Sequence, residues 1–430
     1  MLTGAFTVSA SDTDSISLAI NSNNIPYIAY QDINNGNRVS VSKYNGLCWE
    51  IVGERGFSPG SATYISMAID KNNTPYVAFV DGANGGRTTV MKFNGVDWVI
   101  VGNAGFSTVP VGYTSIAFDS NNTPYVAFDG DGATVMRFNG TSWVPVGSPG
   151  FSAAGALFTS LVLDSHNTPY VSYEDTACNY RATVMKFNGT SWVTVGSACF
   201  SISGVNYMTM AIDSNNTLYV AYQDAGNGFK ASVMKFNGTS WVPVGSLGFS
   251  AGEVFFTTIA IDHNNIPYVA YQDVANQVKT TVMKFNGTNW VTVGNAGFAP
   301  DSGSDTTIAI DNNNAPYTAF HDVSKNVIVM KYTGTEWVTL GCPISSQQQS
   351  ANEWVVGMLA DEARIIHCLR VFFCQTLQEI SNEKCLSPER KVNLAKELIV
   401  AAAQKESALA AVIEAASRFN EAAAEPICPY

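Results

Sequence analysis

The chain has 430 residues, a length that suggests two or three domains of ordinary size. Only 13% of the residues are charged, about half the usual share, and the formal net charge is −12. Binding to a nucleic-acid backbone requires a stripe of basic residues, and this acidic sequence offers none. We therefore expect no nucleic-acid partner.

Targeting signals are absent from the sequence as given. No apolar run approaches the ~20 residues that a membrane-spanning helix needs. The first residues contain neither the basic nor the apolar segment of a secretory signal. We therefore expect no membrane span, and a protein that is either cytoplasmic or exported by a route that needs no such signal.

Tryptophans mark a repeat that fills most of the chain. They lie 45 to 49 residues apart, at Trp49, Trp98, Trp143, Trp192, Trp241, Trp290 and Trp337. A period near this length, with four strand-like segments in each unit, is typical of a β-propeller blade. We predict that residues 1–344 form an all-β, seven-bladed β-propeller of four-stranded antiparallel blades. Each unit is expected to hold its own strands, so that the ring closes by packing the first blade on the last.

The fifth unit illustrates the pattern, with segments rich in β-branched and aromatic residues at 208–212, 219–223, 232–236 and 241–244. Its first and third connections are short turns: an Asp-x-Asn-Asn segment and an Asn-Gly pair. In a meander these two connections share one end of the blade. The longer second connection and the inter-blade connection share the other end, which we call the loop face. We expect binding there, because function concentrates on variable loops held by a rigid scaffold.

The repeat also resembles a known class of propeller. The unit SxAIDSNNTPYVAYxD followed by VMKFNGTSWVxVG, as at residues 213–245, is similar to the repeat of bacterial seven-bladed propellers of the NHL-like and Kelch-like kind. The Trp-Asp dipeptide of WD40 blades is absent. The resemblance implies a fold and no single activity, because such propellers serve as lectins, scaffolds and enzymes.

The composition changes after the last repeat. Residues 345–351 form a polar linker, and residues 352–430 have a helical period with almost no glycine. We expect an α-helical hairpin, with a first helix over about 352–380 and a second from Ser387 and Pro388 to about 424. Two helices alone make a thin core. We therefore expect this region to form a homo-oligomer, to dock a partner or to pack on the propeller.

An aspartate follows the second strand in most units. These residues are Asp32, Asp81, Asp175, Asp224, Asp273 and Asp322, and the shortened third unit has Asp129 and Asp131 on either side of Gly130. A ring of carboxylates on the loop face would accept hydrogen bonds from sugar hydroxyls or bind cations. Alternatively, each carboxylate caps the amides of its own loop. A cap is needed equally in every blade, which favours the second interpretation.

A ring of aromatic residues precedes the first strand of most units. Its members are Tyr64, Tyr113, Phe158, Tyr207 and Phe256, replaced by Ser15 and Asp305 in the first and seventh units. We expect them near the mouth of the central channel on the loop face. There they would either stack on a sugar or seat a peptide, or only pack the channel. The two replacements make the rim asymmetric, which favours one central ligand over seven equal ones.

Metal ions, cofactors and catalysis have little support in the sequence. The eight cysteines do not recur with the repeat, so we expect most to be free thiols packed as small apolar groups. His367, Cys368, Cys374 and Cys385 lack a Cys-x-x-Cys pair, which favours buried thiols over a zinc site. No nucleophile elbow, P-loop or dinucleotide-binding motif occurs, so we assign no catalytic residue and no cofactor.

The leading hypothesis is a non-enzymatic scaffold that presents the loop face for recognition and is assembled or docked through its C-terminal helices. The alternative is a carbohydrate-binding lectin that uses the aromatic and aspartate rings. A third possibility is an enzyme of the glycosidase or lyase type, which would need two carboxylates placed across a bound sugar.

Overall fold

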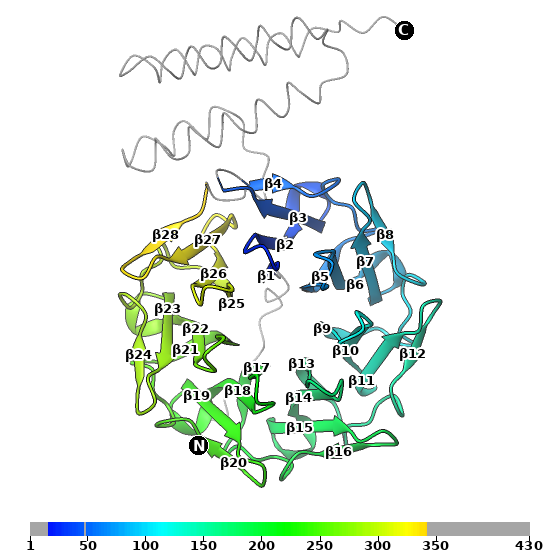
Figure 1. The fold of residues 1–430 in the computed structure, drawn as a ribbon. Coiled ribbons are helices and arrows are strands. Elements are labelled where there is room, and N and C mark those ends of the chain that lie inside the picture. Colours follow the sequence, from blue (N-terminus) through cyan, green and yellow to red (C-terminus); the bar gives the residue numbers. More distant parts are fainter. Residues whose placement is uncertain (1–15, 47–48, 342–430) are drawn as a thin grey trace, which may run out of the picture.

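A computed structural model describes residues 16–46 and 49–341, which form a ring of seven blades around a central channel (Figure 1). Each blade is a four-stranded antiparallel sheet whose strands follow chain order from the channel to the rim. The predicted all-β, seven-bladed propeller is therefore confirmed. The predicted linker at 345–351 and the α-helical hairpin at 352–430 lie outside the described residues.

The strand bounds follow the repeat. Blades 1 to 4 contain β1 (Ile16–Ile20), β2 (Pro26–Asp32), β3 (Arg38–Tyr44), β4 (Trp49–Ile51); β5 (Ala62–Ile69), β6 (Pro75–Asp81), β7 (Arg87–Phe93), β8 (Trp98–Ile100); β9 (Gly112–Phe118), β10 (Pro124–Gly130), β11 (Gly132–Phe138), β12 (Trp143–Pro145); and β13 (Ala156–Leu163), β14 (Pro169–Asp175), β15 (Arg181–Phe187), β16 (Trp192–Thr194). Blades 5 to 7 contain β17 (Val205–Ile212), β18 (Leu218–Asp224), β19 (Lys230–Phe236), β20 (Trp241–Pro243); β21 (Val254–Ile261), β22 (Pro267–Asp273), β23 (Lys279–Phe285), β24 (Trp290–Thr292); and β25 (Ser304–Ile310), β26 (Pro316–His321), β27 (Val327–Tyr332), β28 (Trp337–Thr339).

The helices in the described part of the chain are single 3-10 turns in the second connections of five blades. They are η1 (Ile33–Asn35), η2 (Gly82–Asn84), η3 (Thr176–Cys178), η4 (Ala225–Asn227) and η5 (Val274–Asn276). None of these helices has the length and apolar character needed to cross a membrane.

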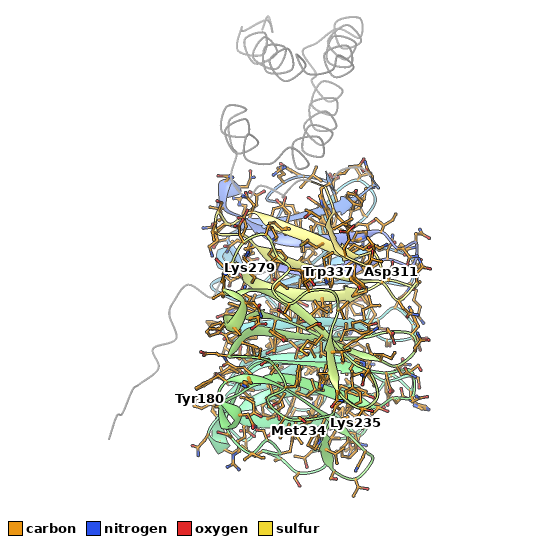
Figure 2. The ribbon with its side chains drawn as sticks, turned by 90° about the vertical axis from the view of Figure 1, so that its left-hand side faces the viewer. Tyr180, Met234, Lys235, Lys279, Asp311 and Trp337 are labelled. Carbon is orange, nitrogen blue, oxygen red and sulfur yellow. A yellow bond between two sulfur atoms is a disulfide. The ribbon has the colours of Figure 1, made fainter. Side chains whose placement is uncertain are left out.

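The two faces of the ring differ as the repeat predicts. Figure 2 places Tyr180 and Lys279, which belong to the ends of second connections, on one face. Asp311 and Lys235, which lie at or next to the short turns, are on the other. The first of these surfaces is the loop face.

The apolar core lies between neighbouring blades. The second strand of blade 2, Pro75–Asp81, is buried along its whole length. Its Val77 packs in one cluster with Val41 of blade 1, whereas Tyr76 packs in another with Val126 of blade 3. Strands covered on both faces explain why the sequence is apolar at successive positions.

The repeated tryptophan joins each blade to the one before it. Trp98 stacks on Phe57 with 4.2 Å between ring centroids, and its Nε1 donates a 2.7 Å hydrogen bond to the carbonyl oxygen of Val52 in blade 1. The same bond recurs around the ring. Trp49 closes the circle by donating to the carbonyl oxygen of Leu340 in blade 7 at 2.6 Å. Among the described residues, the ring therefore closes by packing blade 1 on blade 7, as predicted.

A second circle of hydrogen bonds links the short turns. The last asparagine of each Asp-x-Asn-Asn turn has a positive φ, for example +63° at Asn73. Its side-chain oxygen accepts a bond from a backbone N–H in the turn of the preceding blade, as in the 2.9 Å bond from Ser22 to Asn73. The bond from Asn312 to Asn24, also 2.9 Å, joins blade 7 to blade 1. Both circles join each blade to its neighbours all the way around the ring.

Blade 4 carries a disulfide between Cys178 and Cys199, whose Cα atoms are 6.3 Å apart. Blade 2 has Asn84 and Gly105 at these positions, and a Cβ atom added to this glycine would lie 2.7 Å from the Cβ of the asparagine. The same close approach recurs in blades 1, 5 and 6. The repeat thus brings the two positions into contact, and blade 4 fills both with cysteine. This pair departs from the expectation of free thiols, and the other cysteines lie outside the described residues.

We expect the double variant Cys178→Asn, Cys199→Gly to restore the arrangement of the other blades and to keep the fold. Reduction of the native protein should lower its free energy of unfolding by about 2–4 kcal/mol, because an open disulfide leaves the unfolded chain less constrained. The double variant should not respond to reductant. Urea unfolding with and without dithiothreitol measures both effects, and an equal response of the two proteins would contradict the assignment.

Candidate functional site

The first strand of blades 2 to 7 is interrupted by a β-bulge near the loop face. In blade 2, Thr63 pairs with Val80 and Ser66 pairs with Ala78, so two residues of β5 lie opposite one residue of β6. The residue in the bulge, Tyr64, has a φ of +49°, a left-handed conformation that bulky residues rarely adopt. A bulge changes the direction of a side chain from the one that strict alternation would give it. Here the side chain lines the central cavity.

Five of the described bulges hold an aromatic residue. These residues, which we call the aromatic arc, are Tyr64, Tyr113, Phe158, Tyr207 and Phe256, with φ between 46° and 51°. The centroids of successive rings are 4.5, 4.3, 5.5 and 4.9 Å apart. All five line one cavity of about 280 Å³. The structure thus brings together the five aromatic residues that the sequence analysis placed around the channel mouth.

The aromatic arc is interrupted at blades 7 and 1. Asp305 occupies the bulge of blade 7 with a φ of +56°. Ile16 of blade 1 completes the lining on this side of the cavity. The Nδ1 of His321 lies 3.2 Å from the Oδ2 of Asp305, and the histidine is buried. The cavity therefore has an aromatic wall over most of its circumference and an acidic residue in the gap.

Threonine hydroxyls of neighbouring blades hold the bulges. Thr114 Oγ1 donates a 2.6 Å bond to the carbonyl oxygen of Tyr64, and Thr159 Oγ1 donates a 2.5 Å bond to that of Tyr113. The same bond joins blade 6 to blade 5. These bonds fix the backbone at the three tyrosines of the aromatic arc.

The aspartates that follow the second strands do not line this cavity. In blade 2, Asp81 is fully buried; its Oδ1 accepts a bond from the N–H of Ala83, and its Oδ2 accepts bonds from Asn84 and Thr89. Asp32, Asp175, Asp224 and Asp273 are also buried, Asp322 accepts bonds from the amides of its own loop, and Asp131 is exposed. The bonds match the capping interpretation, so the site proposed below does not include these carboxylates.

A further ring of polar side chains, which the sequence pattern did not predict, adjoins the bulges. Each residue just before the capping position pairs with the residue just before the bulge, as Glu174 does with Leu157. We call this set the inner polar ring: Gln31, Asp129, Glu174, Gln223, Gln272 and His321, with Val80 in blade 2. The signal was a polar residue at the end of an apolar strand, which normally indicates only that the strand is ending.

Two members of the inner polar ring, Glu174 and Gln272, have a buried polar atom without a hydrogen-bond partner among the described residues, and Glu174 is the acid of the two. Its side chain is 1% exposed, and Oε1 has no hydrogen-bond partner among the described residues. Burial raises the pKa of Glu174 well above its usual range, and the bond that the carboxyl accepts from the N–H of Tyr207 opposes this only in part. The surroundings therefore favour the neutral acid. Burial also raises the pKa of Tyr113, and the nearby Tyr64, Glu174 and Asp129 add to this effect.

Asp129 is the second acid beside Tyr113. Burial raises its pKa to about 6, although its Oδ1 accepts a 2.5 Å bond from the N–H of Gly112. The charged form of this side chain is therefore disfavoured in the folded protein.

Replacing Asp129 with asparagine should stabilise the protein at about pH 8 and not at about pH 4. A carboxyl with a pKa of about 6 in the folded state and an ordinary value of 3.8 when unfolded binds its proton more tightly in the folded state. Its stabilising effect is thus complete below about pH 4 and is lost as the pH rises through about 6. A shift of about two units corresponds to about 3 kcal/mol. Urea unfolding at the two pH values measures the difference, and an equal gain at both would exclude charge burial as the cause.

Comparison with known proteins supports the fold and assigns no family. No protein-family model matches this sequence, and no curated protein matches it. Among solved structures, the BP39L lectin from Burkholderia pseudomallei is similar, with a TM-score of 0.57 and 16% identity over 78% of this chain and 99% of that chain. A fucose-specific lectin from Aleuria aurantia matches with a TM-score of 0.48 and 14% identity over 79% of this chain and 98% of that chain. These structures are lectins and lend no specific support to the NHL-like or Kelch-like resemblance. At this level of identity, the similarity to the BP39L lectin shows a shared β-propeller fold and no more.

Proposed function

We propose that this protein is a non-enzymatic, carbohydrate-binding propeller that holds a glycan against the aromatic arc. The observation that carries the proposal is the arc itself, which places five aromatic rings around one cavity of about 280 Å³. The apolar faces of sugars pack on aromatic rings, while their hydroxyls need polar groups nearby. Asp305 and the three tyrosines of the arc bring such groups to the same wall.

The size of the cavity limits the ligand. Small-molecule sites have volumes of about 300–1,000 Å³, and this cavity, at about 280 Å³, lies just below that range. We therefore expect it to take a single sugar unit or the end of a longer glycan. The Burkholderia pseudomallei lectin adds support, because it shows that a propeller similar in fold can be a lectin.

A protein-binding scaffold is the second candidate, and a different observation favours it. Tyr180 and Ile202 of blade 4 are 51% and 73% exposed, and both lie in long connections that belong to the loop face. Large apolar side chains at such exposure are candidate contacts for a protein partner. Self-association through residues 352–430 would serve either function, because several weak sites on one assembly bind with avidity.

Replacing Tyr113 or Tyr207 with alanine should weaken glycan binding by about 30-fold or more, since truncating an aromatic anchor typically costs about 2 kcal/mol. Tyr180→Ala is the matched control, because it removes an exposed tyrosine of the loop face that does not line the cavity. A glycan array followed by calorimetry on the best ligand measures the loss. Binding that survives both channel variants, in proteins with unchanged circular dichroism, would place the site elsewhere.

Deleting residues 345–430 should convert a defined oligomer into a folded monomer, since the tail is expected to supply the assembly contacts. Light scattering after size-exclusion chromatography on the full chain and on residues 1–344 measures this. Two monomers would rule out self-association and direct attention to another partner for the tail.

A further inference from the structure

We infer that the glycan held by the aromatic arc is cationic, an amino sugar whose amine is unsubstituted. This inference rests on the proposed function and names its ligand class. It follows from three features found together: an aromatic wall, acidic side chains on and beside it, and no lysine or arginine among the described residues that line the cavity.

The aromatic wall suits a cation. An ammonium group is attracted to the negative potential over the face of an aromatic ring, and several rings around one position add their effects. Neighbouring rings of the aromatic arc are tilted by 36° to 67° against each other. Because they are not stacked flat, adjoining rings do not cover every face, and a group in the cavity can meet more than one ring.

The acids around the cavity also favour a cation. Asp305 lines the cavity. Asp129 accepts a bond from the N–H of Gly112, next to Tyr113, and Glu174 accepts one from the N–H of Tyr207. A cation in the cavity would favour the ionised form of both carboxyls, which burial disfavours. The Nδ1 of His321 lies 3.2 Å from the carboxylate of Asp305. A sugar acid would meet no lysine or arginine among the described residues that line the cavity, whereas an amino sugar would meet the carboxylate of Asp305.

Glu174 is the residue that a neutral sugar leaves unexplained. Blades 1, 5 and 6 have glutamine at the same position. Gln31 and Gln223 use their amide hydrogens to bond the carbonyl oxygens of the next blades at 2.6 and 2.5 Å. Glu174 loses this bond, and its Oε1 is buried without a partner. An ammonium group beside Tyr207 would stabilise the ionised form of this carboxyl, which burial otherwise disfavours.

The test compares two ligands that differ only in the amine. A short β-linked glucosamine oligomer and its fully N-acetylated counterpart are titrated into the full-length protein, at a mildly acidic pH that keeps the amine protonated. We expect the free amine to bind at least about tenfold more tightly, the size of a well-placed cation–π and charge contribution. Equal binding, or tighter binding of the acetylated oligomer, would overturn this inference and leave the proposed function standing. If neither oligomer nor any other sugar binds, both fail.

A variant separates Glu174 from the general acidity of the protein. Glu174→Gln introduces the residue of three other blades, so it should fold, and it should reduce the preference for the amine about tenfold. Asp301→Asn is the control, because it removes one exposed acid that does not line the cavity and should leave the preference unchanged. If Glu174→Gln does not fold, Asp305→Asn tests the same preference by removing the negative charge that blade 7 brings to the cavity. A preference for the amine that neither Glu174→Gln nor Asp305→Asn reduces would contradict the inference.

Discussion

The indole hydrogen bond from each tryptophan to the preceding blade is the contact on which the ring depends. Among the described residues, no strand of one sheet pairs with a strand of another. Neighbouring sheets are joined by side chains and by backbone bonds to the connections, such as the 2.8 Å bond from the N–H of Ala62 to the carbonyl oxygen of Asn37. A buried hydrogen bond contributes about 1 kcal/mol, but a carbonyl left unpaired in the core costs about 1–3 kcal/mol. The same contact explains why a glycine follows the valine whose carbonyl accepts the indole bond, as Gly53 follows Val52. At Gly53, which also has a positive φ, an added Cβ would lie 3.0 Å from the indole of Trp98.

Rigid blade contacts allow the channel mouth to keep a strained conformation. A bulky residue in the left-handed region costs about 1–2 kcal/mol, and such a residue persists only where its surroundings leave no alternative. Here the ring contacts of the aromatic arc, at about 0.5–1.5 kcal/mol for each pair, and the threonine bonds from the next blade offset that cost. The same forces therefore hold the fold and shape the proposed site. Its side chains are ordered by protein contacts, so a ligand need not order them.

The fold could be predicted from the sequence because its signals are local and repeated. The tryptophan spacing, the Asn-Gly turns and the apolar second strands each occur in every unit or nearly so. The bulge could not be predicted, because it changes the face of a residue without changing its type. In blade 5 the first strand was expected at 208–212 but begins at Val205, since pairing resumes beyond the bulge, where Val205 lies opposite Asp224.

Two other features escaped prediction for related reasons. In the sequence, Glu174 looked like the polar end of a strand. Its place beside the aromatic arc depends on the bulge in the neighbouring strand β13, where Glu174 pairs with Leu157 just before Phe158. Cys178 and Cys199 looked unrelated, since they are 21 residues apart and the contact between an asparagine and a glycine leaves no pattern in the sequence. The residues of the aromatic arc could be predicted because they recur in the sequence, although the sequence does not show their geometry. For the aspartates, ligand binding was a weaker inference than capping, since a residue that every loop needs says little about a ligand.

A ring of copied blades offers either one site at each blade interface or a single site on the axis. Interface sites would repeat, and the features that do repeat here are the indole bonds, the turn bonds and most of the aspartate caps, all of which serve the fold. Two departures from the repeat lie around the axis: Asp305 interrupts the aromatic arc, and Glu174 replaces a glutamine beside it. A ligand on the axis touches several blades at once, so a change in one blade alters the whole site. We therefore regard the channel mouth as the place where specificity is set, with the surrounding blades as its support.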